Sequence, residues 1–165
     1  MNEIFTRVSI RKFEPRPVED EKLERILRAA MAAPSTGNQQ PWEFYIVKNR
    51  KAIEALSRCH RYAGCAKNAP VVLVPCLRTE GLWLPENAEI DLAIATENIL
   101  LEIVSQGLGG VWLGVAPDQA RMDAVGKILH LPKTLRAFAL VPLGYPAEAR
   151  KREDRFDPSR IHTID

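Results

Sequence analysis

The chain has 165 residues, of which 46% are hydrophobic and 27% charged, a composition typical of a soluble globular protein of one domain. Its 23 basic and 21 acidic residues are mostly interspersed and give a net charge of +2, which argues against a nucleic-acid-binding protein. The longest apolar stretches are interrupted by residues such as Glu97 and Asn98, and no basic stretch followed by an apolar core opens the chain. We therefore expect neither a membrane span nor a signal peptide.

The three cysteines and three histidines give no recognisable site. The cysteine spacing fits neither a zinc ribbon nor a redox pair, and the histidines lie far apart in the sequence. We expect reduced, mostly buried thiols, a cytoplasmic location and no metal centre.

The N-terminal quarter is predicted to be helical and then to form a loop. Asn2 is expected to cap a short first helix, and a second helix with one apolar stripe is predicted over residues 19–32. Residues 33–41 are predicted to be a polar loop and neither helix nor strand, because prolines near both ends bracket small and amide residues.

The middle of the chain alternates strands and helices. Strands are predicted over residues 42–47 and 71–74, with a helix capped by Asn49 between them. A long helix over residues 86–106 is apolar around most of its circumference. In a domain this small, such a helix indicates a dimer interface. Its narrow polar stripe is predicted near Asp91, Asn98 and Glu102.

The C-terminal part continues the alternation and ends in a charged tail. The glycines of segment 107–110 are predicted to end the long helix through their freedom to adopt positive φ. Strands are expected over 111–115 and 137–143, a helix capped by Asp118 over 119–129, and a tail over 147–165 that is mobile unless it docks. The pattern predicts an α+β or mixed α/β protein without internal repeats.

No dinucleotide fingerprint, phosphate loop, nucleophile elbow or compelling pair of carboxylates is found. Three polar residues near the N-terminus offer another chemistry. Arg7, Ser9 and Arg11 alternate with the apolar Val8 and Ile10, which predicts an extended segment with its polar side facing one way. Two guanidinium groups and a hydroxyl suit a phosphate dianion, although a solvated surface segment has the same composition.

Two further places could serve the same ligand. The loop residues Ser35, Asn38 and Gln40 carry groups that suit a heterocycle with carbonyls and ring nitrogens, although they equally fit a plain turn. The triplet 150–152 could be a second clamp on the anion or a solvated basic surface.

Four motifs together make the chain similar to the nitroreductase family of FMN enzymes, in the family's order and over nearly the whole length. They are Arg7-Val8-Ser9-Ile10-Arg11-Lys12-Phe13, Ala33-Pro34-Ser35-Thr36-Gly37-Asn38-Gln39-Gln40-Pro41-Trp42, Gly109-Gly110-Val111-Trp112-Leu113-Gly114, and Leu143-Gly144-Tyr145-Pro146 with the basic cluster after it.

The resemblance implies one FMN-binding domain over residues 1–165, with an α+β fold. Its central mixed, mostly antiparallel sheet would be flanked by helices, and the helix 86–106 would lie at the interface of a homodimer that binds two FMN molecules. The implied flavin contacts are Arg7, Val8, Ser9 and Arg11 with Arg150 and Arg152 at the phosphate and ribityl chain, Pro34, Ser35, Asn38 and Gln40 from the other subunit or along the ring edge, and Leu113 and Gly114 against the isoalloxazine.

The implied activity is a ping-pong reaction in which NADH or NADPH donates hydride to flavin N5 and an electron-poor acceptor, such as a nitroaromatic or quinone, is then reduced. The alternatives are flavin-fragmenting or dehalogenating chemistry on the same fold, a non-enzymatic flavin-binding protein, or a dimer without flavin. Two departures matter. Val8 stands where many relatives carry a basic residue or histidine, leaving its backbone for contact, and the chain lacks the insertion that covers the substrate site in larger relatives.

Overall fold

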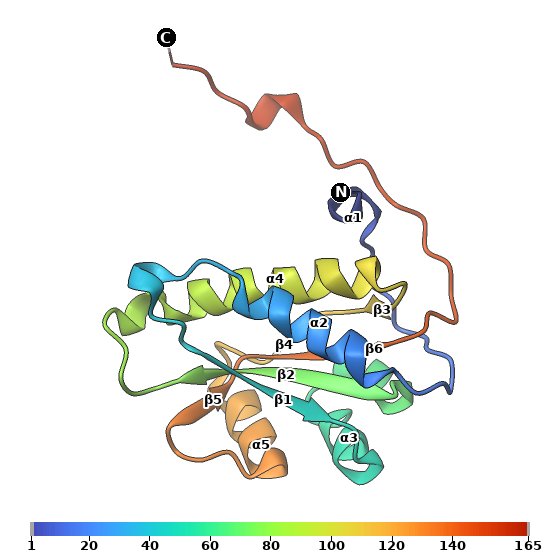
Figure 1. Ribbon diagram of the computed structural model, residues 1–165, viewed down its shortest axis with the longest axis vertical. Coiled ribbons are helices and arrows are strands. Elements are labelled where there is room, and N and C mark those ends of the chain that lie inside the picture. The colour runs from blue at the N-terminus through green and yellow to red at the C-terminus, as the bar shows by residue number, and fades with distance from the viewer. Residues whose placement is uncertain (1, 165) are drawn as a thin grey trace.

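The computed structural model describes residues 2–164, so Met1 and Asp165, the ends of the predicted domain, lie outside the described residues. One sheet carries helices on both faces (Figure 1). The strands pair antiparallel in the order β1-β2-β6-β3, with β5 also on β2 and β4 also on β6. The strands are β1 Trp42–Val47, β2 Val71–Arg78, β3 Gly109–Gly110, β4 Leu113–Gly114, β5 Leu135–Ala137 and β6 Ala139–Gly144.

The helices form two layers. Helices α2 and α4 pack together on one face of the sheet, and α3 and α5 lie on the other (Figure 1). The helices are α1 Glu3–Thr6, α2 Asp20–Met31, α3 Arg50–Leu56, α4 Ala88–Ser105 and α5 Gln119–Leu129, and the 3-10 turns are η1 Thr36–Asn38, η2 Ala63–Asn68, η3 Pro85–Asn87 and η4 Pro158–Arg160. This layered α+β arrangement agrees with the prediction.

Two of the three predicted helix caps are confirmed. The side chain of Asn49 accepts from the Ala52 amide, and that of Asp118 accepts from the Arg121 amide. The Asn2 side chain makes no capping hydrogen bond, so that prediction was wrong. Asn2 has a backbone in the helical region (φ −115°, ψ −5°) and not the extended backbone of a capping residue, and its carbonyl accepts from the hydroxyl and amide of Thr6.

Strand β2 runs four residues beyond its predicted end at Val74 and includes Pro75. A proline is tolerated in a strand where no partner needs its missing N–H. Pro75 lies opposite the break between β5 and β6, where the Phe138 amide donates to the Pro75 carbonyl. The same break explains why the strand predicted over 137–143 is divided here.

The segment around the glycine cluster also differs from the prediction. Gly107 ends α4 with a φ of 71°, as expected, but Gly109 and Gly110 form strand β3. A side chain at Gly109 would place its Cβ 2.7 Å from Ile10 Cγ1, so this glycine lets the N-terminal segment approach β3 closely. Of the strand predicted over 111–115, only β4 has strand geometry.

The predicted polar stripe on the long helix is wrong in one respect. Asp91 is 2% exposed, and the exposed face of α4 carries Ile90 and Ile94 instead. Asp91 is buried because the loop 33–41 folds over it and supplies hydrogen-bond donors. That loop is itself not wholly irregular, since it contains the turn η1. Within residues 2–164, no helix is both long and apolar enough to cross a bilayer.

Candidate functional site

The N-terminal segment lies extended alongside β3. The Ile10 amide donates to the Gly110 carbonyl over 2.9 Å, and Ser9 forms a parallel bridge with Gly110. Ile10 is 7% exposed and belongs to the core, which turns Arg7 and Ser9 to the opposite side. The predicted alternation is therefore confirmed for Ile10, whose core contact orients the polar side chains, whereas Val8 is only partly buried against the core and also lies on the side of Arg7 and Ser9.

The start of the tail is attached to the same segment. The Glu14 amide donates to the Tyr145 carbonyl and the Ala147 amide donates to the Lys12 carbonyl, both over 2.9 Å. The Glu148 carboxylate accepts from the Arg11 amide at 2.7 Å. That hydrogen bond is the main cause that holds the pKa of Glu148 below its usual range. The tail therefore begins beside residues 7–11, which we call the arginine segment, although 137 positions separate Arg11 from Glu148.

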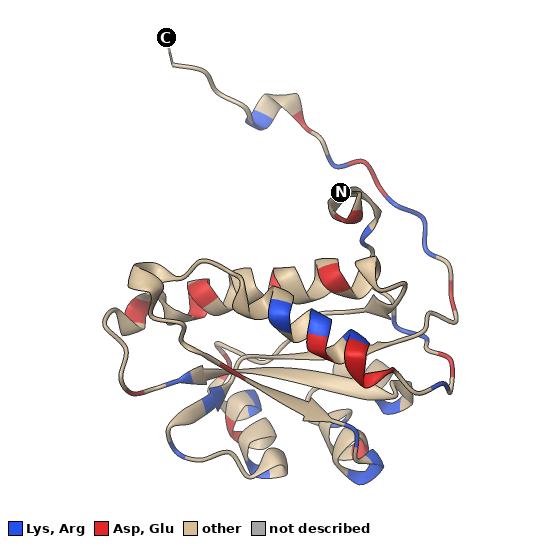
Figure 2. Ribbon diagram, viewed as in Figure 1, with Lys and Arg blue, Asp and Glu red and all other residues tan. Residues whose placement is uncertain are grey.

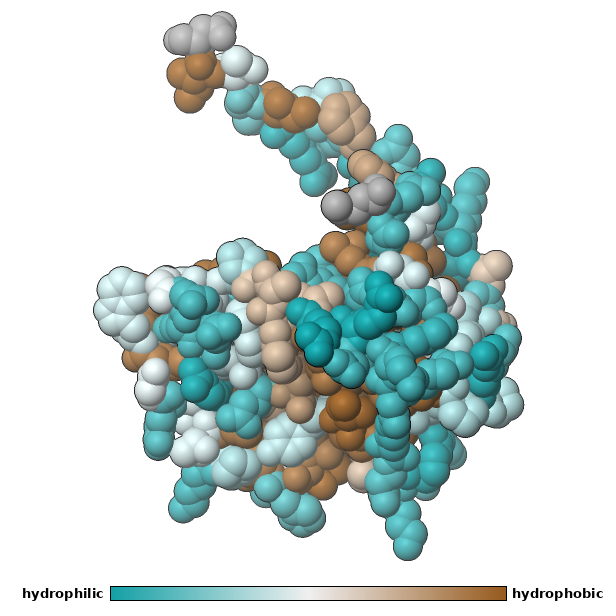
Figure 3. Space-filling view, in the orientation of Figure 1, coloured by the Kyte–Doolittle hydropathy of each residue, from teal (hydrophilic) through white to brown (hydrophobic). Residues whose placement is uncertain are grey.

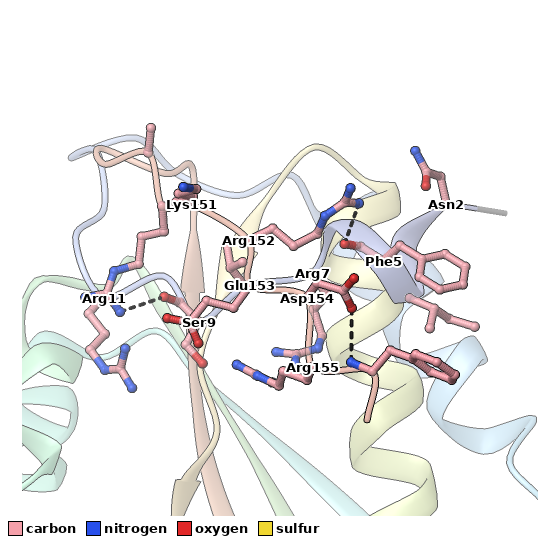
Figure 4. Close-up of a pocket in the computed structure, with 15 residues that line it drawn as sticks. Asn2, Phe5, Arg7, Ser9, Arg11, Lys151, Arg152, Glu153, Asp154 and Arg155 are labelled. Atoms are coloured by element: carbon pink, nitrogen blue, oxygen red, sulfur yellow. Dashed lines mark hydrogen bonds between the residues drawn. The ribbon is translucent and has the colours of Figure 1, made fainter. Parts of the chain in front are cut away.

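A cleft of about 1200 Å³ lies between this segment, α1 and the tail (Figure 4). We call it the arginine cleft. Its lining residues are Asn2, Ile4, Phe5, Arg7, Val8, Ser9, Arg11, Ala149, Arg150, Lys151, Arg152, Glu153, Asp154, Arg155 and Phe156. Cations outnumber carboxylates among them, and Figure 2 shows basic residues along the tail where it passes the N-terminal segment.

The cations of the cleft are engaged to different degrees. Arg7 Nε lies 3.4 Å from a Glu97 carboxylate oxygen, and Arg152 Nη1 donates to the Phe5 carbonyl over 2.8 Å. Within residues 2–164 the Arg11 guanidinium makes no ion pair or hydrogen bond. Arg11 and the Ser9 hydroxyl thus remain available to an anion. This donor set fits a phosphate monoester, which takes charge-assisted bonds from arginine together with neutral donors.

The loop 33–41, which we call the amide loop, has an unusual backbone. Gly37 and Asn38 both have a φ of 55°, and Gln40 has a φ of 46°. Glycine adopts this left-handed region freely and asparagine does so more readily than other residues, whereas Gln40 persists there only because its surroundings hold it. Such strain is concentrated at binding and catalytic sites, so the loop is a candidate ligand contact.

Two side chains outside the amide loop hold it in place. The buried Asp91 carboxylate accepts from the Thr36 amide at 2.9 Å and hydroxyl at 3.1 Å, and from Gln39 Nε2 at 2.8 Å. From the end of β2, Arg78 Nη2 donates to the carbonyls of Gln39 and Gln40 at 3.0 and 3.2 Å. The loop is therefore fixed from both α4 and the sheet.

Strand β4 supplies the last predicted pair. Leu113 is buried and pairs with Leu140, whereas a side chain at Gly114 would point into open space. The Gly114 carbonyl accepts from Arg121 Nη1 at 3.3 Å. Gly114 therefore leaves a stretch of backbone that a flat ligand can approach.

The twelve predicted site residues fall into three groups. Arg7, Val8, Ser9, Arg11, Arg150 and Arg152 line the arginine cleft. The remaining six do not line it: Pro34, Ser35, Asn38 and Gln40 lie in the amide loop, and Leu113 and Gly114 lie in β4. One apolar cluster contains Ala33 and Trp42, which flank the four loop residues, and also Trp112, which precedes β4; its Trp112 and Phe138 rings lie 5.5 Å apart.

Sequence reasoning missed the residues that position the site. Gln39, Arg78 and Glu148 were not singled out, and Asp91 was placed on a solvated stripe. Asp91 offered a weak signal, since its short carboxylate lies between the apolar Ile90 and Leu92 of a helix that is apolar nearly all round, and a buried carboxylate must find donors. The other three act through contacts between distant segments and leave no local pattern.

The thiols do not form a reactive centre. Cys59, Cys65 and Cys76 are free, and burial raises the pKa of Cys76 to about 12 and that of the other two above their usual range. Burial also lowers the pKa of His60. Among the residues that the structure describes, no three His, Cys, Asp or Glu side chains cluster as metal ligands.

Comparison with known proteins places this geometry in a family. Residues 4–145 match the model of the nitroreductase family. A provisionally named NADH dehydrogenase/NAD(P)H nitroreductase of Archaeoglobus fulgidus is 40% identical, over 96% of this chain and 94% of the relative. The crystal structure of a provisionally named NADH oxidase from Clostridium acetobutylicum superposes with a TM-score of 0.95 at 42% identity, over 99% of both chains.

A third match carries a ligand. The structure of a provisionally named nitroreductase of Desulfovibrio desulfuricans, in complex with FMN, has a TM-score of 0.85 at 25% identity and covers 99% of this chain and 95% of that one. The family model spans the N-terminal segment, the amide loop and β4, and the solved structures extend the likeness through the tail. The chain belongs to the nitroreductase family.

Proposed function

We propose that this protein is a homodimeric FMN-dependent oxidoreductase that accepts hydride from NADH or NADPH and passes two electrons to an electron-poor acceptor such as a nitroaromatic or a quinone. The family membership and the relatives' names support the oxidoreductase class. The acceptor, the alternating order of the two half-reactions, the dimer and the cytoplasmic location remain predictions.

One observation carries the proposal. Arginines from the two ends of the chain, Arg7 and Arg11 at one end and Arg150 and Arg152 at the other, line a single cleft around Ser9. Holding this many like charges together costs free energy, which a bound dianion would offset. The phosphate of FMN is the group that these donors would hold.

The amide loop and β4 have the chemistry needed at the flavin ring. Ser35 and Asn38 present a hydroxyl and an amide for the carbonyls and nitrogens of the isoalloxazine, and Gly114 leaves backbone room beside it. These groups lie outside the arginine cleft of their own chain. In the proposed dimer, the amide loop would reach the flavin of the partner subunit.

Exposed apolar side chains support the dimer. On α4 Ile90 is 61% exposed and Ile94 38% exposed, and apolar residues also stand along the tail, which projects away from the body (Figures 1 and 3). Phe156 and Ile161 in that tail are exposed as well. A second copy of the chain would cover these residues and remove their apolar surface from water.

FMN, when bound, supplies the redox chemistry by accepting and returning hydride equivalents at its N5 atom. The chain's own part is to bind and orient. Arg11 and Ser9 would fix the phosphate end, and the rigid amide loop would fix the ring edge. No side chain needs to act as nucleophile or general base, which agrees with the raised pKa of the thiols.

The absorption spectrum of the purified protein and chromatography of the released chromophore test the cofactor. We expect an oxidised-flavin spectrum and FMN. Anaerobic mixing with NADH or NADPH should bleach the flavin, and a quinone or nitro compound should restore the colour. Bound FMN that neither nicotinamide reduces would favour the flavin-fragmenting, dehalogenating or non-enzymatic alternatives. Protein that binds no flavin would contradict the proposal altogether.

Dilution tests the dimer independently of catalysis. If each flavin site needs both subunits, FMN should be released over the same protein concentration range in which sedimentation velocity detects monomers. A monomer that keeps its FMN would rule out a shared site.

A further inference from the structure

Trp83 is a large aromatic residue whose side chain is exposed to solvent. It lies in the loop between β2 and α4 and is 71% exposed. Flanking residues Leu82 and Leu84 are half-buried, so the loop itself is packed while the indole is not. Aromatic side chains bury much apolar area when they find a partner, which makes an ordered, exposed indole a candidate contact for a ligand.

The indole is positioned by the amide loop. A Cβ at Gly37 would lie 2.3 Å from Trp83 Cε3, so the ring rests directly on the backbone of this glycine. Gly37 also has a φ of 55°, and its lack of a side chain therefore serves both the turn and the ring contact. Trp83 thus lies beside the segment that contains Ser35 and Asn38.

A reciprocal pair of hydrogen bonds fixes the neighbouring backbone. Gln39 Nε2 donates to the Leu84 carbonyl, and the Leu84 amide donates to Gln39 Oε1, each over 3.0 Å. Gln39 is in turn held by the buried Asp91. The chain on the C-terminal side of Trp83 is therefore tied to the same anchor as the amide loop.

We propose that Trp83 is a specificity-determining residue that stacks on the ring of a planar aromatic acceptor at the flavin site. This inference rests on the proposed function, in which the amide loop lies along the flavin. The electron-rich indole face attracts an electron-poor ring, so nitroaromatics and quinones are favoured over acceptors without a flat ring. Because the loop of Trp83 is short, the residue would bind the acceptor without closing over it.

Kinetics of the FMN-loaded holoenzyme with 4-nitrobenzoate and with ferricyanide test the role. Ferricyanide takes electrons without stacking and serves as the internal reference. Replacing Trp83 by Ala or Leu should raise KM for 4-nitrobenzoate roughly tenfold, as expected for one lost stacking contact. Trp83→Phe should keep most of the affinity. FMN content and ferricyanide turnover should not change in any of the three variants.

Tyr62 provides the matched control. It is 60% exposed, lies under the Arg61 guanidinium and immediately precedes the turn η2. Tyr62→Ala should leave both acceptors unaffected. Fluorescence adds a readout without turnover: the emission lost in Trp83→Phe should be quenched saturably by 4-nitrobenzoate in the wild-type protein, with a midpoint near KM.

Three results would overturn the inference. Equal KM values for 4-nitrobenzoate in the wild type and the Ala and Leu variants, with flavin still bound, would remove Trp83 from the acceptor site while leaving the proposed function intact. Dissociation of these variants into monomers would make Trp83 a subunit contact instead. A wild-type protein without flavin would overturn the proposed function and this inference with it.

Discussion

The arginine cleft and the amide loop are built in opposite ways. The cleft is assembled from the two ends of the chain, and Arg11 and most of the tail residues that line it are exposed and make few contacts. The amide loop is short and local, yet it is anchored on the 2%-exposed Asp91 and held by Arg78. Charge is therefore the main feature of the arginine cleft, and a conformation fixed by hydrogen bonds is the main feature of the amide loop.

The difference follows from what each region must recognise. A phosphate is compact and doubly charged, so long cations can close on it from several directions and tolerate imprecise placement. The edge of a planar heterocycle needs donors and acceptors at fixed positions, which a strained loop held in place by Asp91 and Arg78 supplies. Removing a charge from the cleft should therefore weaken ligand binding with little loss of stability. A substitution at the anchor of the amide loop should instead lower the stability of the protein.

The largest effect is expected at the anchor of the amide loop. Asp91→Ala would leave the buried donors of Thr36 and Gln39 without an acceptor and should lower the free energy of unfolding by about 3 kcal/mol. Urea denaturation measures this change. Glu89→Ala, at an exposed position of the same helix, should change it by less than about 1 kcal/mol. Equal stability of the two variants would contradict the anchoring role of Asp91.

The corresponding substitution in the arginine cleft should weaken FMN binding and leave the stability of the protein unchanged. Arg11→Ala removes a guanidinium that has no partner within residues 2–164, and loss of a charge-assisted bond of about 1.5–3 kcal/mol should weaken FMN binding roughly 10- to 100-fold. Fluorescence titration of apoprotein with FMN measures the affinity. Arg58→Ala, at an exposed arginine paired with Glu54 on α3, is the control. Unchanged FMN affinity would exclude Arg11 from the site.

A glycine substitution tests how closely the cleft depends on the core. Gly109→Ala would bring a methyl group within 2.7 Å of Ile10 and should destabilise the protein by about 1–3 kcal/mol while displacing the arginine segment. Gly126→Ala, in α5 with open space around it, should instead stabilise by up to about 1 kcal/mol. Thermal unfolding compares them. Two variants of equal stability would show that the segment moves away freely.

The smallest effect is expected at Glu148 and depends on pH. Its pKa is lowered in the fold mainly by the Arg11 amide, so its stabilising contribution is complete above the ordinary carboxyl pKa and is lost as the pH falls through the lowered value. Glu148→Gln should thus lower Tm slightly at pH 7, and the difference from the wild type should shrink below about pH 4. A difference that is independent of pH would exclude this linkage.

Much of this protein is determined locally. The strand β1 and helix α5 match their predicted bounds, α2 and α4 agree within two residues, and α3 begins at its predicted cap, because apolar periodicity and the caps Asn49 and Asp118 act over a few residues. The family motifs are local in the same sense. They identify the family because each motif occupies a contiguous stretch of sequence. The match of the family model to residues 4–145 confirms that identification.

Other features were decided only by tertiary structure. Pro75 remains in a strand because its partner strand is broken, and Asp91 is buried because a loop 55 positions away supplies its donors. The arginine cleft exists because the tail pairs with residues 12–14 and so places Arg150 near Ser9. Local patterns fix elements through short-range sterics and hydration, whereas these contacts join segments whose proximity only the packed fold creates.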